Sequence, residues 1–143
     1  MRVQQKNFRR RGFRGKVVPV KDQSILIVED NGLIALLLQE FLKKNRYKIP
    51  VPVASGEEAI EYLKKFSYPD LILMDITLDG SINGIETARQ IRKTSAVPVI
   101  FLSAHEDMDL FFREGEISHS GYITKPFLLS DLLSLVEKTL DQQ

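Results

Sequence analysis

The stretch Leu71-Ile72-Leu73-Met74-Asp75 decides the fold of this chain. Its four apolar residues follow one another without the polar alternation of a half-exposed strand, and an acidic residue comes directly after them. A strand that is covered on both faces of a sheet loses this alternation. We therefore predict a buried strand of a parallel sheet, and we expect this strand to end at a carboxylate.

Similar short apolar runs lie on both sides of this stretch, and they alternate with segments of helical periodicity. The predicted strands are residues 24–28, 51–54, 71–74, 97–102 and 121–124, and the predicted helices are residues 33–42, 57–66, 84–92, 108–114 and 130–140, the last capped by Ser130 or Asp131. Five strand and helix units in series indicate a parallel sheet with helices on both faces. The predicted class is α/β, doubly wound.

The composition is that of one soluble domain, with 143 residues of which 43% are hydrophobic and 27% are charged. The chain has no cysteine, which excludes disulfides, thiolate catalysis and cysteine-ligated zinc and fits a cytoplasmic location. No apolar run approaches the roughly 18 residues that span a bilayer. No apolar segment follows the basic N-terminus either, so we expect neither a membrane span nor a secretory signal.

The first 22 residues differ in charge from the remainder of the chain. They hold eight Lys or Arg side chains against one acid, Asp22, whereas residues 23–143 are acidic overall. Glycines and a proline interrupt any regular period here, so we expect residues 1–22 to form a flexible basic arm. Residues 9–16 mix arginine, glycine and phenylalanine and could bind nucleic acid, but we favour a solvated tail.

Polar side chains stand directly after the predicted strands. These side chains are Glu29, Asp30, Asp75, Ser103 and Lys125. The carboxyl ends of parallel strands meet at one edge of the sheet, where α/β proteins bind their ligands. Three carboxylates brought together repel one another unless a cation intervenes, and an oxygen-only cluster suits Mg²⁺ or Mn²⁺. A lysine and a hydroxyl beside that ion would balance the charge of a phosphoryl group.

Each of these residues also has an ordinary structural explanation when it is taken alone. Glu29 and Asp30 precede a predicted helix and could cap it, Asp75 could start a turn, and Ser103 could cap the next helix. Lys125, which precedes a proline, could simply belong to a loop. The order of all of them along a five-unit α/β chain favours a common site over coincidence.

Five sequence motifs carry a resemblance to a known family. They are residues 25–31 (ILIVEDN), 70–76 (DLILMDI), 84–86 (GIE), 97–104 (VPVIFLSA) and 121–127 (GYITKPF). On these motifs, residues 23–141 resemble a response-regulator receiver domain of the chemotaxis-regulator kind. The resemblance implies a receiver domain over residues 23–143 with a flavodoxin-like (βα)₅ fold, in which five parallel strands follow the order 2-1-3-4-5.

The resemblance also implies a role for each strand-end residue. Asp75 would accept phosphate from a histidine kinase or a histidine phosphotransfer domain, as the nucleophile of a phosphorelay switch and not as the base of an ordinary enzyme. Glu29, Asp30, Asp75 and the backbone carbonyl of Thr77 would hold Mg²⁺. Ser103 and Lys125 would contact the phosphoryl oxygens, and the Lys125–Pro126 peptide bond would be cis.

Signal output, by the same resemblance, would be a two-state change in which Ser103 moves towards the phosphate and Tyr122 rotates into the vacated space. A partner protein would then dock on the fourth helix, fifth strand and fifth helix. Tyr122 could instead be a packed strand aromatic with its hydroxyl in water. The chain ends 18 residues after Lys125, so we expect a stand-alone receiver.

The sequence departs from the family pattern near the acceptor. Residues 76–83 are one residue longer than the common form and lack its usual proline, so we expect a looser turn. Thr77 and His105 would flank the route of water to the phosphoaspartate and tune its lifetime, although His105 could equally be an exposed helix-start residue. An aspartyl-phosphate hydrolase would need a second aspartate where Thr77 stands, which argues against that enzyme class.

Overall fold

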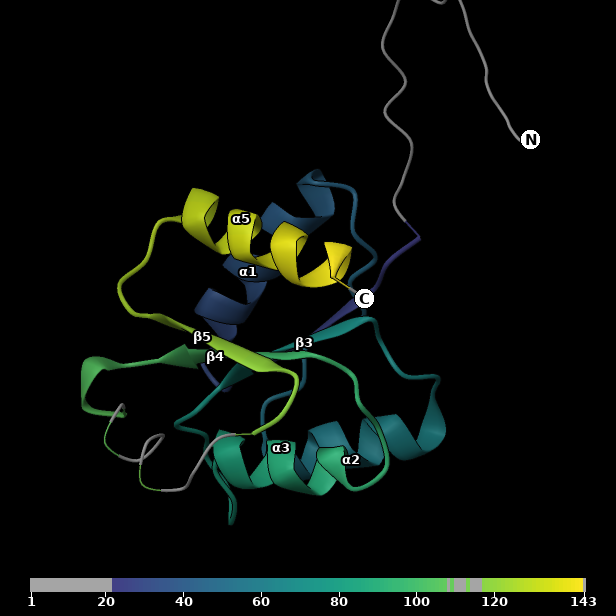
Figure 1. Ribbon diagram of the computed structural model, residues 1–143, viewed down its shortest axis with the longest axis vertical. Coiled ribbons are helices and arrows are strands. Elements are labelled where there is room, and N and C mark those ends of the chain that lie inside the picture. The colour runs from purple at the N-terminus through teal and green to yellow at the C-terminus, as the bar shows by residue number, and fades with distance from the viewer. Residues whose placement is uncertain (1–21, 108, 110–112, 114–116, 143) are drawn as a thin grey trace, which may run out of the picture.

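The computed structural model describes residues 22–107, 109, 113 and 117–142. In chain order the described elements are β2 (Ile25–Val28), α1 (Gly32–Lys44), α2 (Gly56–Lys65), β3 (Leu71–Asp75), α3 (Gly84–Arg92), β4 (Val99–Ser103), the 3₁₀ helix η1 (His105–Asp107), β5 (Ser120–Thr124) and α5 (Leu129–Asp141). Four of them form a parallel sheet in the order β2-β3-β4-β5. Helices α1 and α5 cover one face of this sheet and α2 and α3 cover the other (Figure 1). The doubly wound α/β fold is confirmed.

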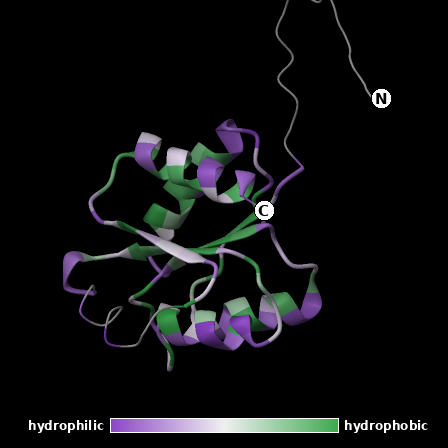
Figure 2. Ribbon diagram, viewed as in Figure 1, coloured by the Kyte–Doolittle hydropathy of each residue, from purple (hydrophilic) through white to green (hydrophobic). Residues whose placement is uncertain are grey.

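The core consists of two layers that the alternating side chains of the strands create. In β2, Leu26 and Val28 pack towards α2 and α3, while Ile25 and Ile27 pack towards α1 and α5. Every residue of β2, β3 and β4 is buried, and Figure 2 shows the strands behind the paler β5 as a hydrophobic layer between helices whose outer sides are polar. Burial of one such side chain stabilises the fold by about 1.5–3 kcal/mol, so these strands supply much of the stability.

The strand predicted at residues 51–54 differs from the prediction. Parallel bridges join Ser24 to Lys48 and Val28 to Val53, on the edge of β2 opposite β3. The Glu29 N–H donates to the Val53 carbonyl at 2.9 Å, and the Val53 N–H donates to the Ile27 carbonyl at 3.0 Å. Prolines at 50 and 52 have no N–H to donate, so the ladder is interrupted. The segment lies where the order 2-1-3-4-5 puts its second strand, but as two isolated bridges.

Side-chain caps fix the start of the first three helices. Asn31 accepts hydrogen bonds from the N–H groups of Leu33 and Ile34 at the start of α1. Ser55 caps α2 and Asn83 caps α3 in the same manner, each satisfying a backbone donor that the helix leaves unpaired.

The predicted cap of the last helix is wrong. Helix α5 begins at Leu129 with Leu128 as its cap residue, and within the described part of the chain it has no side-chain cap. Ser130 and Asp131 lie inside the first turn. Asp131 still complements the positive end of the helix dipole there, which explains why an acid at this position resembles a cap in the sequence.

Two further expectations concern residues that lie outside the described ranges. The helix predicted at residues 108–114 includes 108, 110–112 and 114, and the basic arm predicted at residues 1–22 includes residues 1–21. The nucleic-acid hypothesis for residues 9–16 falls in this part of the chain. Within the residues that are described, no helix combines the length and the apolarity needed to cross a bilayer.

Candidate functional site

Three carboxylates meet at the carboxyl edge of the sheet, as the sequence predicts. Glu29 and Asp30 follow β2, and Asp75 is the last residue of β3. One carboxylate oxygen from each lies within 4.8 Å of the others. Glu29 is 3% exposed and Asp75 is 4% exposed, while Asp30 is half-buried at the rim. The register that pairs β2 with β3 brings these residues together.

Lys125 reaches this cluster from the end of β5. Its Nζ lies 3.3 Å from Asp75 Oδ1 and 3.9 Å from Glu29 Oε1. The Lys125 N–H donates to the Ser103 carbonyl at 2.7 Å, and the Lys125–Pro126 peptide bond is cis. Ser103 is fully buried at the end of β4. The ammonium is therefore anchored beside Asp75 by the backbone of the strand that carries Ser103.

The electrostatics of the cluster favour a cation. Burial raises the pKa of Glu29 to about 7, with a further increase from the negative charge of Asp75, although the Asn31 N–H and Lys125 act in the opposite direction. Glu29 Oε1 is buried and, among the described residues, accepts no hydrogen bond. A buried oxygen with unused acceptor capacity next to two further carboxylates matches the donor set of a hard divalent cation.

The loop between β3 and α3 is held on several sides, contrary to the looser turn expected from its extra residue. The Asp79 N–H donates to Asp30 Oδ2 at 3.2 Å. Both the N–H and the hydroxyl of Ser81 donate to Glu57 Oε2, at 2.8 and 2.7 Å, and these bonds lower the pKa of Glu57. Gly80 supplies a left-handed φ of 106° between these anchors, which a glycine adopts without strain. Carboxylates thus tie the loop beside the acceptor.

The start of α3 packs directly against the acceptor residue. A Cβ on Gly84 would overlap the carbonyl oxygen of Asp75. The Gly84 N–H donates to the Ile76 carbonyl at 2.8 Å. Only a residue without a side chain permits this approach, so Gly84 helps to fix the backbone of Asp75.

The remaining predicted residues lie around this centre. The Thr77 N–H donates to Asp75 Oδ1 at 3.3 Å. Tyr122 lies on β5 opposite Phe101 and is 44% exposed. His105 begins η1 and is exposed. The structure therefore places Thr77 at the acceptor, His105 just after the strand of Ser103, and Tyr122 on the strand that leads to Lys125.

A hollow of about 400 Å³ opens next to the carboxylates, between α1 and the bridged segment at residues 52–54. Its lining residues are Glu29, Asp30, Gly32, Ala35, Leu36, Gln39, Pro52, Val53 and Ala54. The acidic cluster therefore has an open approach from solvent.

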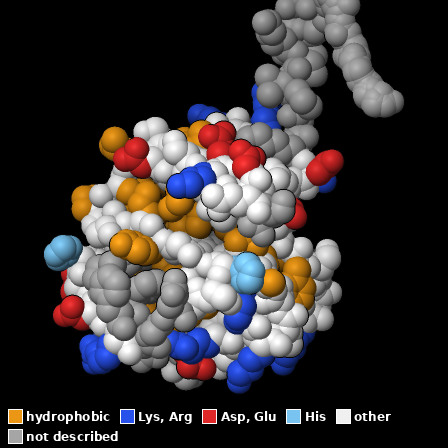
Figure 3. Space-filling view, viewed as in Figure 1, with side chains coloured by type: hydrophobic (Ala, Val, Ile, Leu, Met, Phe, Trp, Pro, Cys, Tyr) orange, Lys and Arg blue, Asp and Glu red, His pale blue; other side chains and the backbone are white. Residues whose placement is uncertain are grey.

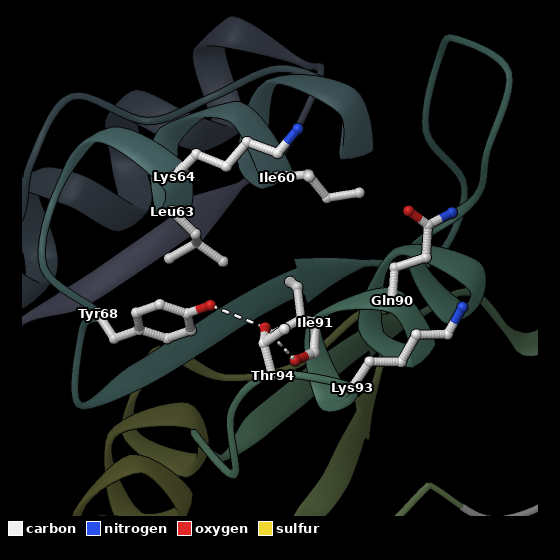
Figure 4. Close-up of a pocket in the computed structure, with 8 residues that line it drawn as sticks. All are labelled: Ile60, Leu63, Lys64, Tyr68, Gln90, Ile91, Lys93 and Thr94. Atoms are coloured by element: carbon white, nitrogen blue, oxygen red, sulfur yellow. Dashed lines mark hydrogen bonds between the residues drawn. The ribbon is translucent and has the colours of Figure 1, made fainter.

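A second groove lies between α2 and α3, where Figure 3 shows Lys and Arg side chains along the edge of the molecule. It has a volume of about 310 Å³, and Ile60, Leu63 and Ile91 contribute its apolar lining (Figure 4). The Tyr68 and Thr94 hydroxyls hydrogen bond across it at 2.9 Å. Its lining residues include none of the strand-end side chains, so this groove is separate from the acidic cluster.

Sequence reasoning missed Asp107, a buried acid at the end of η1. Asp107 accepts hydrogen bonds from the Thr77 hydroxyl and from the Ala104 N–H. Asp107 lies three residues after Ala104, which is the spacing at which the acid of a capping box binds the backbone N–H of the cap residue, although alanine lacks the side-chain oxygen of the other half. That spacing was a readable signal for the Ala104 contact, but the contact with Thr77 depends on tertiary structure.

Comparison with known proteins agrees with this geometry. The family model described as "Response regulator receiver domain" matches residues 25–137. The transcriptional regulatory protein PdtaR of Mycobacterium tuberculosis is 34% identical over 113 residues, which are 79% of this chain and 54% of that protein. The chemotaxis protein CheY of Bacillus subtilis is 30% identical over 118 residues, which are 82% of this chain and 97% of that protein.

A solved structure of a response regulator domain is similar to this chain in both fold and sequence. The N-terminal domain of a response regulator/sensory box/GGDEF 3-domain protein from Carboxydothermus hydrogenoformans superimposes with a TM-score of 0.72 and 35% identity, covering 84% of this chain and 95% of that one. The chain spans about half the length of the transcriptional regulators among its curated relatives.

Proposed function

This chain belongs to the response regulator receiver domain family, and on that premise we propose that Asp75 takes a phosphoryl group from the phosphohistidine of a sensor histidine kinase or a histidine phosphotransfer domain. The family is one of signalling switches, so the phosphorylated form would be a signal and not a turnover intermediate. The observation that carries the proposal is the buried Asp75 carboxylate with the Lys125 ammonium 3.3 Å from its Oδ1.

The chemistry follows from the position of these side chains. An oxygen of Asp75 bonds to phosphorus, the phosphorus–nitrogen bond of the phosphohistidine breaks, and its electron pair returns to the imidazole nitrogen. Lys125 and the Thr77 N–H both contact Oδ1, which orients the carboxylate before the donor arrives. Lys125 then balances the charge of the phosphoryl oxygens, and the Ser103 hydroxyl would donate to one of them.

A divalent cation belongs to the same proposal. Glu29, Asp30 and Asp75, with the backbone carbonyl of Thr77, would hold Mg²⁺ or Mn²⁺, and the buried unused oxygen of Glu29 supports this ligand set. Such a cation would neutralise the charge that otherwise keeps an anionic carboxylate away from an anionic phosphoryl group.

Output would come from a change at Ser103 and Tyr122. The hydrogen bond from the Lys125 N–H to the Ser103 carbonyl links the end of β4 to the end of β5, so a movement at Ser103 would reach the strand that carries Tyr122. We place the docking surface for a downstream protein on β5, α5 and the helix predicted before β5. The absence of cysteine fits a cytoplasmic location for this exchange.

Incubation with acetyl phosphate and Mg²⁺ tests the proposal. We expect the intact mass of the wild type to increase by one phosphoryl group. Asp131→Asn is the control and should increase in the same way, because Asp131 is an acid of α5 that does not belong to the carboxylate cluster. Asp75→Asn should stay unmodified, and Lys125→Ala should react more slowly. Equal modification of Asp75→Asn and the wild type would overturn the proposal.

The switch has a separate test. Tyr122→Ala should accept phosphate at the wild-type rate, because the Tyr122 side chain lies outside the acceptor contacts described above. Hydrogen exchange along β5 and α5 should respond to phosphorylation in the wild type but not in this variant. Loss of phosphorylation in Tyr122→Ala would refute the switch assignment and leave the acceptor assignment standing.

A further inference from the structure

One buried carboxylate, that of Asp107, joins the two loops that flank the acceptor. The Thr77 hydroxyl lies 3.0 Å from its Oδ1 and 3.2 Å from its Oδ2. The Ala104 N–H donates to Oδ2 at 3.0 Å. Asp107 is 9% exposed, so these hydrogen bonds to a charged group form largely out of water and are stronger than surface contacts.

Both ends of this connection lie next to residues of the acceptor site. Thr77 is two residues beyond Asp75, and its N–H contacts Asp75 Oδ1. Ala104 directly follows Ser103, whose carbonyl accepts the Lys125 N–H. Among the described hydrogen bonds, Asp107 has none to Asp75 or to Lys125. It binds the hydroxyl of Thr77, which lies beside the acceptor, and the N–H of Ala104, which follows Ser103.

Capping of a helix start explains only part of this arrangement. The Asp107 carboxylate accepts the Ala104 N–H, as the acid of a capping box does, while the Asp107 N–H donates to the Ala104 carbonyl at 3.0 Å as the backbone bond of the 3₁₀ turn. A cap does not require a hydroxyl from a loop 30 residues away in the chain. The contact with Thr77 thus adds a second role for the same carboxylate.

The contact fixes the direction of the Thr77 hydroxyl. A hydroxyl has one hydrogen, and a carboxylate is a pure acceptor, so the two distances describe one hydrogen shared between Oδ1 and Oδ2. That hydrogen is therefore donated to Asp107, and the described contact between Thr77 and Asp75 is made by the backbone N–H alone. Release of the hydroxyl would let it turn towards the acceptor and bind a water molecule there.

We propose that Asp107 is a positioning residue that holds the Thr77 hydroxyl away from phosphorylated Asp75 and thereby prolongs the life of the acyl phosphate. This inference rests on the proposed function. In the hydrolysis that ends the signal, water oxygen bonds to phosphorus, the bond from phosphorus to the Asp75 oxygen breaks, and its electron pair returns to the carboxylate. The proton that the water loses passes to the released phosphate or to solvent. A hydroxyl freed beside Asp75 would orient that water and accelerate the step.

Phosphoaspartate lifetimes in matched variants test the inference. The proteins would be loaded with acetyl phosphate and Mg²⁺, and the donor would then be removed. Asp107→Asn should lose phosphate about fivefold faster than the wild type, which is the change in rate that the free energy of about one hydrogen bond produces. The amide keeps an oxygen for the Ala104 N–H, so the helix cap survives, but its NH₂ group donates to the Thr77 oxygen and frees the hydroxyl hydrogen. Glu106→Gln removes an exposed acid from the same 3₁₀ helix and should retain the wild-type lifetime.

A double variant separates the hydroxyl from a loosened loop. Adding Thr77→Val to Asp107→Asn removes the hydroxyl and should abolish the acceleration. Equal lifetimes in the wild type and Asp107→Asn would overturn the inference, and so would an acceleration that persists in the double variant. A wild type that never accepts phosphate would defeat the proposed function itself, which distinguishes the two failures.

Discussion

Strand β3 contains two side chains that are both buried but differ in polarity. Leu73 is 0% exposed and Asp75 is 4% exposed, although one is apolar and the other carries a charge. A similar change from an apolar to a polar side chain occurs after β2, where Glu29 follows Val28, and at the end of β4, where Ser103 follows Leu102. The core and the acidic edge are thus adjacent along the chain, where each buried strand ends.

The difference between the core and the edge teaches where stability and chemistry reside in this fold. Each core side chain stabilises the protein by removing apolar surface from water. At the edge, burial works against the charged form of Glu29, whose pKa rises to about 7, and the neighbouring Asp75 adds repulsion. Substitutions in the core should therefore change stability, whereas substitutions at the edge should change function and leave the fold intact.

Truncation in the core should have the largest effect. Phe101 is fully buried on β4 in the layer under α2 and α3. Phe101→Ala should lower the free energy of unfolding by about 3–5 kcal/mol, through lost burial and the cavity that remains. Urea denaturation measures this change. Leu128→Ala, at a side chain that is 67% exposed, is the control and should change it by less than about 0.5 kcal/mol. Similar losses in both variants would contradict the division into core and surface.

Gly84 lies where the core meets the acidic edge, so its substitution should affect both stability and phosphorylation. The added methyl group of Gly84→Ala overlaps the Asp75 carbonyl oxygen and should lower the free energy of unfolding by about 1–3 kcal/mol while slowing phosphorylation. Gly32→Ala is the matched control, because nothing lies within 4 Å of a Cβ at that position. It should be neutral or stabilising by up to about 1 kcal/mol, since alanine favours helices. Phosphorylation of Gly84→Ala at the wild-type rate would show that this contact does not position the acceptor.

Glu29 should make the stability of the metal-free protein depend on pH. Its pKa rises from 4.5 to about 7 in the folded protein, mainly because of burial, so the folded state binds this proton more tightly than the unfolded chain. The resulting stabilisation is complete below pH 4.5 and is lost as the pH rises towards 7, a decrease of about 1–3 kcal/mol.

Unfolding in urea with a chelator at about pH 5 and about pH 8 measures this slope. Glu29→Gln should lose it, because the amide has no proton to release. Glu61→Gln, at an exposed position on α2, should retain the wild-type slope. Added Mg²⁺ should restore stability at the higher pH in the wild type but not in Glu29→Gln. A slope that survives in Glu29→Gln would assign the titration to another group.

Asn31 lies next to the acidic edge, but we expect its side chain to affect the stability of the fold and not phosphorylation. Asn31→Ala removes the acceptor for two N–H groups of α1 and should lower the free energy of unfolding by about 1 kcal/mol. Ser130→Ala should change it by less than about 0.5 kcal/mol, because Ser130 does not cap α5. Thermal unfolding of both variants checks this, and an equal loss in Ser130→Ala would restore the cap that the sequence predicted.

The strands and the acidic cluster were predictable because the signals for them are local. The apolar run before Asp75 marks a buried strand, and parallel strands bring their carboxyl ends together whatever the loops do. The strand predicted at residues 51–54 was harder to predict. Pro50 and Pro52 interrupt its hydrogen-bond ladder, yet the segment still lies beside β2. The hydrogen bond between the Thr77 hydroxyl and Asp107 was not predictable, because it joins two loops 30 residues apart in the chain.

The most direct test of the account is the position of the phosphate. The wild type would be phosphorylated with acetyl phosphate and Mg²⁺, reduced with borohydride to convert the acyl phosphate to an alcohol, and digested for peptide mass spectrometry. The account predicts one converted residue, Asp75. Conversion at Glu29, Asp30 or Asp107, or unchanged phosphorylation of Asp75→Asn, would contradict it.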